Sequence, residues 1–399
     1  MNLKNKANTL AKTNVTIVGG GSSTHALIPF LTSSSREINL LTSKPEEWES
    51  SIILEYRNEN NDVLQEFNGQ LDNVSDLPID VIPKSDIIIL CMPVYKYREA
   101  LDNIASYLSP NTVIGTIYGQ GAFNFMVNEI KNKYDLINIT TFAIGLIPWI
   151  CRIEKYGKIG ITYGAKNLNI VAFDHKNKFS ELEEFFNDIC FKWFKKGKFK
   201  LSENFISLTL SVDNQIIHTS RLYGLYIKSQ GIWNNESDVP YFYKDYDDLS
   251  ATLLKELDSD YSLIREAIKS LYSKNNYDFM LDYLQLEQLT YNSSNKNIKE
   301  SFVNSETLGA IKTPVIKQNN QYIINKNHRF FYDDIYYGLC IAKWIAEKLD
   351  LNVKTIDEIL YWSQDILHDK IIKDNKLVEN VKSGAFNIYS CFTIDEIIK

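Results

Sequence analysis

The sequence lacks any long apolar segment. Its longest apolar run, residues 87–94, is far shorter than the ~20 residues that a membrane-spanning helix needs. The first 13 residues are polar and contain lysine, without the apolar core of a secretory signal. We therefore expect a cytoplasmic protein that neither crosses nor binds a membrane.

Cysteine is scarce, and an excess of positive charge is absent. The five cysteines show no C-x-x-C spacing, so neither a disulfide framework nor a zinc site is indicated, and we expect no metal. The 43 basic and 50 acidic residues give a net charge of −7, which provides no basic surface for nucleic acid. We expect small-molecule partners for a protein that is a monomer or a homodimer.

What the chain does contain is a regular alternation of short β-branched runs and amphipathic stretches over residues 14–173. This order is typical of a parallel sheet covered by helices on both faces. The runs that we interpret as strands are residues 15–18, 38–41, 86–90, 112–117 and 137–142, with residues 159–162 and 168–173 extending the same sheet. The expected fold is an α/β Rossmann-type doubly wound parallel sheet.

The second half of the chain has a different periodicity. Strand patterns disappear after about Leu201, and helical periods follow over residues 249–271, 332–349 and 356–367. Because 399 residues commonly divide into two or three domains, we place a dinucleotide-binding domain at residues 1–200 and a mostly helical substrate-binding and catalytic domain at residues 201–399.

A glycine cluster follows the first predicted strand and precedes a helix. In this context glycines let the backbone approach a pyrophosphate, and the helix N-terminus supplies free N–H groups. The residues expected to contact the cofactor here are Gly19, Gly20, Gly21, Ser22, Ser23 and Thr24. Thr24 replaces the usual third glycine, and a tight strand-to-helix turn without a ligand is the alternative explanation.

The end of the second predicted strand carries Thr42, Ser43 and Lys44, where NAD-binding proteins commonly have an acidic residue. A hydroxyl and a cation suit a 2′-phosphate, so we favour NADPH over NADH, although Lys44 would also suit a solvated surface. Met92 and Pro93 follow another strand, and we expect them beside the nicotinamide because ligands bind beyond the carboxyl ends of such strands.

The helical half contains the candidate catalytic groups. Among the five histidines, His218 stands out because its flank is apolar and Asn214 lies one helical turn earlier. Arg329 and Asp334 lie at the start of an amphipathic helix. Reduction beside a carboxylate needs a guanidinium, a histidine and an acid that orients it. The alternatives are a core histidine and a surface arginine near an acidic helix N-terminus.

The chain resembles the octopine/opine dehydrogenase family along nearly its whole length. The stretches that carry the resemblance, in the family's order and spacing, are the glycine loop from Gly19, residues 41–48, 119–121 and 148–153, Asn214 with His218, and residues 238–243, 329–339 and 362–364. The resemblance implies NAD(P)H-dependent joining of an amino acid to a 2-oxo acid, with pyruvate as the expected oxo acid, in a reversible reaction.

The resemblance also implies roles for individual residues. His218 and Asp334 would form the proton-transfer dyad, and Arg329 would bind the oxo-acid carboxylate. Gln120, Asn214, Leu146 and Pro148 are expected near the substrate. Relatives that use arginine have an acidic residue near this position, whereas here Gly145 and Leu146 precede Ile147 and Pro148, which suggests a small or apolar amino acid.

Two other functions remain open at this point. The same cofactor half occurs in dehydrogenases of 2- or 3-hydroxy acids that have a helical second domain. The altered third glycine is also compatible with a non-catalytic dinucleotide sensor. Dependence of turnover on an amine separates the first from an opine dehydrogenase, and any turnover excludes the second.

Overall fold

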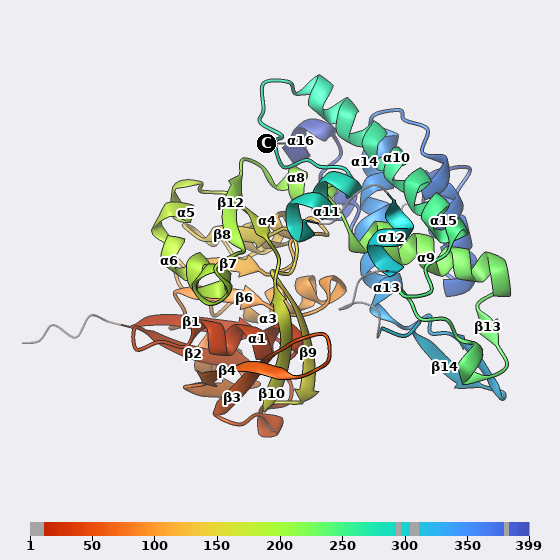
Figure 1. The fold of residues 1–399 in the computed structure, drawn as a ribbon. Coiled ribbons are helices and arrows are strands. Elements are labelled where there is room, and N and C mark those ends of the chain that lie inside the picture. Colours follow the sequence, from red (N-terminus) through yellow and green to blue (C-terminus); the bar gives the residue numbers. More distant parts are fainter. Residues whose placement is uncertain (1–11, 293–296, 304–310, 379–382, 399) are drawn as a thin grey trace, which may run out of the picture.

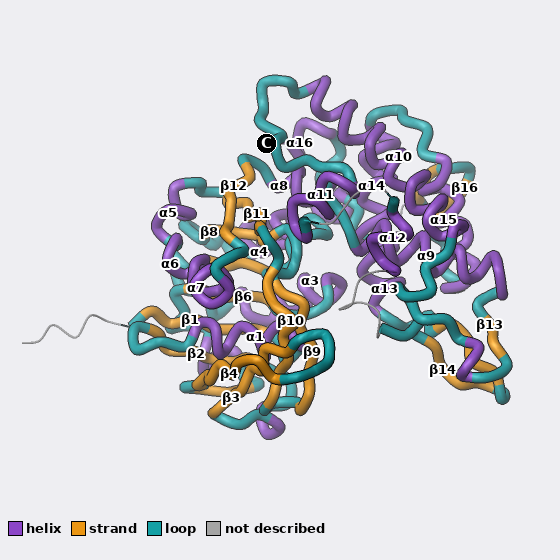
Figure 2. The backbone as a smooth tube through the Cα atoms, viewed as in Figure 1, coloured by secondary structure: helices purple, strands orange, loops and turns teal. Residues whose placement is uncertain are grey.

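The computed structural model describes residues 12–292, 297–303, 311–378 and 383–398, which form two lobes (Figure 1). Strands dominate the lobe built from the first half of the chain, and helices dominate the other (Figure 2). Within the described residues, no helix is both long and apolar enough to cross a membrane.

The first lobe is organised around an eight-stranded sheet. Its strand order is β12 (Lys198–Ser202), β11 (Leu168–Phe173), β8 (Thr140–Ile144), β7 (Val113–Thr116), β6 (Ile87–Leu90), β1 (Thr13–Val18), β2 (Arg36–Leu41) and β5 (Asn73–Ser75). All neighbours are parallel except β8 and β11. With helices on both faces, this sheet confirms the predicted Rossmann-type fold.

Side chains alternate between the two faces of this sheet. Ile89 of β6 packs into the cluster beneath α1 (Ser22–Leu31), whereas its neighbour Ile88 packs beneath α3 (Tyr97–Ala105) and α4 (Phe123–Lys133). This alternation explains why the buried strands read as continuous apolar runs in the sequence. The shorter helices of the lobe are α2 (Pro78–Val81), α5 (Asn177–Glu181), α6 (Glu183–Phe186), α7 (Lys192–Phe194) and α8 (Phe205–Leu210).

A second sheet lies against α1 and corrects one sequence-based expectation. Its order is β4 (Val63–Gln70), β3 (Ser51–Arg57), β10 (Ile159–Ala165) and β9 (Trp149–Lys155). Residues 159–162 were predicted to extend the main sheet, and that placement is wrong, because β10 pairs with β3 and β9 instead. Gly160 permits this arrangement, since a Cβ there would lie 2.8 Å from the Cβ of His25 on α1.

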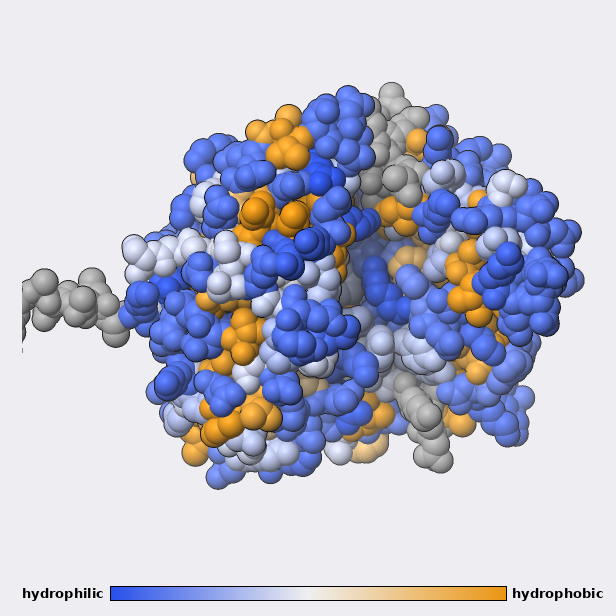
Figure 3. All heavy atoms as spheres, turned by 90° about the horizontal axis from the view of Figure 1, so that it is seen from below, coloured by the Kyte–Doolittle hydropathy of each residue, from blue (hydrophilic) through white to orange (hydrophobic). Residues whose placement is uncertain are grey.

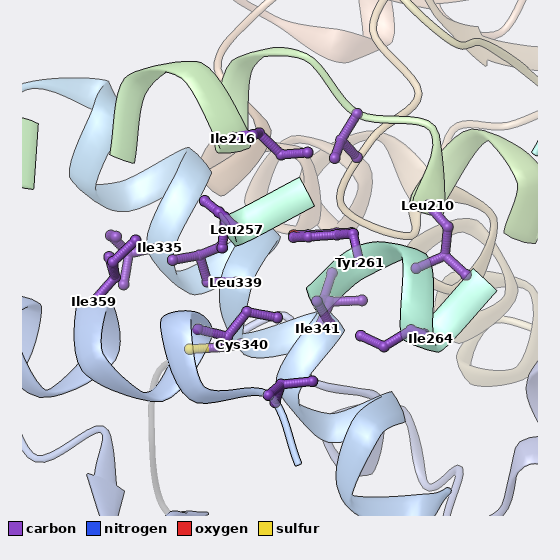
Figure 4. Packing of buried hydrophobic residues seen from close by; sticks show 14 of the residues in the cluster. Leu210, Ile216, Leu257, Tyr261, Ile264, Ile335, Leu339, Cys340, Ile341 and Ile359 are labelled. Atoms are coloured by element: carbon purple, nitrogen blue, oxygen red, sulfur yellow. The ribbon is translucent and has the colours of Figure 1, made fainter. Parts of the chain in front are cut away.

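The second lobe is helical, as predicted. Its helices are α9 (Asn214–Ser229), α10 (Asp248–Leu271), α11 (Tyr283–Tyr291), α12 (Ile298–Val303), α13 (Arg329–Phe331), α14 (Cys340–Lys348), α15 (Lys354–Leu367) and α16 (Ile394–Ile398). Figure 4 shows Leu257 and Tyr261 of α10 packed against Ile335 and Leu339, which lie on a π-helical segment, Tyr332–Leu339, between α13 and α14.

Strands are not wholly absent from this lobe, which the sequence pattern missed. A three-stranded sheet contains β13 (Ile232–Trp233), β15 (Gln321–Ile324) and β14 (Val315–Gln318), and a short hairpin pairs β16 (Ile372–Lys373) with β17 (Lys376–Leu377). These strands have two to four residues each, too few to show a period of two.

Candidate active site

A cleft of about 860 Å³ lies between the two lobes. Its walls come from the glycine loop and the ends of β6 and β7 on one side, and from α9, α11, α12 and α13 on the other. Figure 3 shows the molecule hollowed between its lobes on this face. Ligand sites are commonly found at domain interfaces and beyond the carboxyl ends of parallel strands, and this cleft meets both conditions.

The glycine loop has the geometry of a phosphate cradle. Gly19 has a φ of +110°, and a Cβ there would lie 2.6 Å from the carbonyl oxygen of Cys91, so only glycine fits. Gly21 is the N-cap residue of α1 and provides no side-chain cap, and the nearest atom to a Cβ at Gly21 would be 3.7 Å away. Gly21, Ser22 and Ser23 line the cleft, so the uncapped helix N-terminus fits a dinucleotide pyrophosphate.

The remaining residues of this loop have structural contacts. Thr24 is buried and donates a hydrogen bond from Oγ1 to the carbonyl oxygen of Gly19 at 2.6 Å. This hydrogen bond holds the turn together at the position where the glycine motif usually has its third glycine. Tyr156 covers Gly20, because a Cβ on Gly20 would lie 2.5 Å from the tyrosine hydroxyl oxygen. Gly19, Gly20 and Thr24 therefore shape the loop without lining the cleft.

The end of β2 lies beside the glycine loop but outside the cleft. Thr42 is buried, and Ser43 and Lys44 are exposed. The Nζ atom of Lys44 lies 2.8 Å from Oε1 of Glu47 and 5.7 Å from the ring centroid of Tyr156. Lys44 is therefore an exposed cation near the loop, and an acidic residue of its own helical turn already pairs with it.

His218 and Asp334 form a buried pair at the base of the cleft. Nδ1 of His218 shares a hydrogen bond of 2.8 Å with Oδ2 of Asp334, and Nε2 shares one of 3.1 Å with the hydroxyl of Tyr243. The imidazole also stacks on Phe330, with ring centroids 3.6 Å apart. The sequence-predicted dyad is thus assembled from α9 and the π-helical segment, 116 residues apart in the chain.

Burial dominates the electrostatics of this pair. It holds the pKa of His218 well below its usual value, and the nearby positive charge of Arg329 lowers it further. Burial raises the pKa of Asp334 to about 8. The pair therefore disfavours separated charges near neutral pH and can hold one exchangeable proton, which suits a group that donates and accepts protons.

Arg329 lies on the rim of the same cleft. Its side chain is 42% exposed, and Nη1 lies 3.9 Å from Oδ2 of Asp333, which is longer than a hydrogen bond. Asp333 is buried and accepts a 3.0 Å hydrogen bond from the backbone N–H of Tyr95 in the nucleotide-binding lobe. The guanidinium thus retains donors for a ligand carboxylate while Asp333 connects its helix to the other lobe.

Of the four residues expected near the substrate, Asn214 alone lines the cleft. Gln120 is buried beside it, with Nε2 donating to the carbonyl oxygen of Ser211 across the lobes at 3.3 Å and Oε1 accepting from Tyr118. Leu146 packs in a separate small apolar space, and the Pro148 carbonyl accepts the backbone N–H of Lys166, so the structure brings neither side chain into the cleft.

Several residues that line the cleft were not predicted from the sequence. Tyr243 lies in a stretch that carried the family resemblance, which was a signal without an assigned role. Lys166, Asp213 and Glu287 are buried in the cleft wall, yet each sits in an ordinary polar sequence context. Only the fold, which gathers them from separate elements, shows that they belong to the site.

Comparison with known proteins supports this architecture. The family model described as "NAD/NADP octopine/nopaline dehydrogenase, alpha-helical domain" matches residues 201–367. Octopine dehydrogenase of Mizuhopecten yessoensis is 20% identical over 377 residues, which are 91% of this chain and 92% of that protein.

Solved structures show the same fold. An octopine dehydrogenase structure with NADH and L-arginine has a TM-score of 0.81 and 18% identity, covering 97% of this chain and 98% of its own. An NADP+-bound yersinopine dehydrogenase has a TM-score of 0.63 and 14% identity, covering 90% of this chain and 91% of its own. The helical half of the chain thus matches the octopine/nopaline dehydrogenase family model, and the whole chain is similar in sequence and in fold to octopine dehydrogenases.

Proposed function

We propose that the protein is an NAD(P)H-dependent oxidoreductase that reductively condenses an amino acid with a 2-oxo acid, with pyruvate as the oxo acid. The observation that carries this proposal is the His218–Asp334 pair, which lies with Arg329 in one cleft opposite the uncapped glycine loop. The match of residues 201–367 to the family model and the similarity to curated octopine dehydrogenases support it.

Each group has a definite task in this reaction. Arg329 binds the oxo-acid carboxylate with its planar fork of N–H donors. His218 donates a proton to the carbonyl oxygen as the amine adds and water leaves, which produces an imine. Asp334 holds the imidazole by Nδ1 and shares the one exchangeable proton of the pair with it, leaving Nε2 toward Tyr243 and the cleft.

The nicotinamide, when bound, supplies the hydride that reduces the imine to a secondary amine. Gly21, Ser22 and Ser23 would hold the pyrophosphate at the start of α1, with Met92 and Pro93 beside the nicotinamide. In the reverse direction, His218 accepts the proton that it donates in the forward direction. The balanced reaction consumes one amine, one oxo acid, one NAD(P)H and one proton, and releases water.

We infer that NADPH is preferred over NADH. Thr42 and Ser43 offer hydroxyls and Lys44 a cation at the end of β2, where no carboxylate follows the strand directly. Substitution of Lys44 by Glu should raise the KM for NADPH by tenfold or more and leave that for NADH nearly unchanged. An unchanged KM for NADPH would remove Lys44 from cofactor recognition.

A screen of cofactor oxidation tests the proposed reaction. NADH and NADPH would be offered with pyruvate, glyoxylate or 2-oxoglutarate, with and without each amino acid. The proposal requires oxidation that depends on the amine. Oxidation by an oxo acid alone at the same rate would indicate a hydroxy acid dehydrogenase, and a complete lack of turnover would indicate a dinucleotide sensor.

A further inference from the structure

Both ring nitrogens of His218 already have partners in the protein. Nδ1 lies 2.8 Å from Oδ2 of Asp334, and Nε2 lies 3.1 Å from the hydroxyl oxygen of Tyr243. His218 is 1% exposed, and Tyr243 is also buried while its side chain lines the cleft. A proton that leaves the imidazole at Nε2 is therefore received first by the Tyr243 hydroxyl.

A buried arginine fixes the position of Tyr243. Arg221 is 0% exposed and lies three residues after His218 on α9. Its guanidinium donates hydrogen bonds of 3.2, 3.0 and 2.8 Å to the backbone carbonyl oxygens of Tyr241, Phe242 and Asp245. These bonds hold the backbone on both sides of Tyr243 against the helix that carries His218. The contact between phenol and imidazole is therefore built into the fold.

Asp334, His218 and Tyr243 form one hydrogen-bonded chain that ends at the cleft. The carboxyl group of Asp334 makes no other hydrogen bond within the part of the chain that the structure describes, so its proton can pass to the imidazole alone. The imidazole bonds the carboxyl group on one side and the phenol on the other. The geometry thus connects a buried acid to the cleft through two groups that can each accept one proton and release another.

Burial sets the protonation states along this chain. It raises the pKa of Asp334 to about 8 and holds the pKa of His218 well below its usual value, so near neutral pH the acid is protonated and the imidazole uncharged. Burial also raises the pKa of Tyr243, whose hydroxyl stays neutral. A carboxylic acid that donates to Nδ1 selects the tautomer with its proton on Nε2, and this proton is donated to the phenol oxygen. Each group then holds a proton directed toward the cleft.

Arg329 places a bound oxo acid near the phenol. After burial, the positive charge of Arg329 has the largest effect on the pKa of Tyr243 and lowers it, which indicates that the guanidinium lies close to the hydroxyl. Both side chains line the cleft. Because the carbonyl carbon of a 2-oxo acid is bonded to its carboxylate, an oxo acid held at Arg329 has its carbonyl oxygen in the same part of the cleft as the phenol.

We propose that Tyr243 is a catalytic residue that passes a proton from His218 to the carbonyl oxygen of the oxo acid. This inference rests on the proposed function and specifies its proton route. The phenol O–H bond breaks as the substrate O–H bond forms, the phenol takes the proton of Nε2, and Nδ1 takes the proton of Asp334. The imidazole changes tautomer without becoming a buried cation, and the charge left behind lies on the Asp334 carboxylate. The proton that the overall reaction consumes restores Asp334.

Substitution of Tyr243 by Phe removes the hydroxyl and keeps the ring. In single-turnover experiments with cofactor, pyruvate and a saturating amine, the rate constant for cofactor oxidation should fall by about 10²-fold or more, as for other positioned acid–base groups. The KM for pyruvate should change by less than about twofold, because Arg329 remains in place. A rate constant within about threefold of the wild-type value would overturn the inference, since the hydroxyl would then only cap the histidine.

Tyr246→Phe is the matched control. It removes a buried hydroxyl from the same segment, and Tyr246 does not line the cleft. The hydroxyl of Tyr246 lies 3.3 Å from that of Ser220, which also donates to the carbonyl oxygen of Ile216 and so keeps a partner in the variant. Tyr246→Phe should retain the wild-type rate constant. An equal loss of rate in both variants would contradict a relay, because it would trace the loss to packing of the segment.

A proton inventory distinguishes a relay from a residue that only positions His218. In mixtures of H2O and D2O, the wild-type single-turnover rate constant should fall below a straight line as the deuterium fraction rises, because several protons move in one step. The plot for Tyr243→Phe should lie closer to a straight line, because one proton fewer moves. A straight wild-type plot, or equal curvature in the two proteins, would overturn the relay.

Failure of the relay can be told apart from failure of the proposed function. A wild-type protein without amine-dependent cofactor oxidation would reject the proposed function and the relay with it. Amine-dependent turnover in the wild type that Tyr243→Phe retains in full would reject the relay alone.

Discussion

At the scale of single residues, the account depends first on His218. Its imidazole contacts Asp334, Tyr243 and Phe330 and lines the cleft, where it can exchange protons with a substrate. His218→Ala should lower kcat by about 10²–10⁴-fold, the usual contribution of a positioned acid–base group. The exposed His175 provides the control, and His175→Ala should leave kcat unchanged. If a folded His218→Ala variant kept its full kcat in steady-state assays, the histidine would be excluded from the mechanism.

Arg329 should act mainly on oxo-acid binding. Hydrogen bonds between a guanidinium and a carboxylate contribute about 1.5–3 kcal/mol, so Arg329→Gln should raise the KM for pyruvate by roughly 10–100-fold. The effect on kcat should be smaller, because His218 and Asp334 remain in place. A variant with an unchanged KM for pyruvate would show that the carboxylate binds elsewhere.

Burial of Asp333 should make the stability of the protein depend on pH. Burial and the neighbouring Asp334 raise its pKa to about 7, above its unfolded value of 3.8. Between these two pH values the folded protein binds more protons than the unfolded chain, so this residue's contribution to stability is lost as the pH rises toward 7.

The comparison of wild type with Asp333→Asn tests this sign. The amide retains an acceptor for the Tyr95 N–H but does not titrate. The Tm of wild type relative to the variant should fall between pH 5 and pH 8 by about 2 °C or more, which corresponds to ~1 kcal/mol in domains of this size. A constant difference across that range would mean that Asp333 does not titrate as described.

At the scale of elements, a substitution in the glycine loop can separate effects on cofactor binding from effects on folding. A Cβ on Gly21 would meet its nearest atom at 3.7 Å, an ordinary contact, whereas a Cβ on Gly19 would meet the Cys91 carbonyl at 2.6 Å. Gly21→Ala should therefore keep its Tm within about 2 °C while raising the cofactor Kd tenfold or more. Unchanged cofactor affinity in Gly21→Ala would show that the pyrophosphate lies elsewhere.

Elements with strong periodicity could be predicted from the sequence, and those defined by packing could not. The long amphipathic pattern predicted α10, and the buried β-branched runs predicted β1, β2 and β6. The placement of β10 in a second sheet could not be predicted, because a strand's pattern does not identify its neighbours. The π-helical segment was also unpredictable, since its sequence reads as an ordinary amphipathic helix.

At the scale of the whole molecule, the site exists only because two lobes meet. The sequence indicated His218, Asp334 and Arg329 from the resemblance and from the chemistry that they supply. It did not indicate Lys166 and Glu287, which come from different elements and line the same cleft only after folding. Single residues with a chemical signature were predictable, whereas a cluster assembled by the tertiary fold was not.

The central claim is that this cleft joins an amine to an oxo acid by reduction. Mass spectrometry of the product after incubation with NADPH or NADH, pyruvate and an amino acid tests it most directly. The account predicts a secondary amine whose composition is the sum of the two substrates minus one water plus two hydrogen atoms. Formation of lactate alone, with the amino acid recovered unchanged, would contradict it.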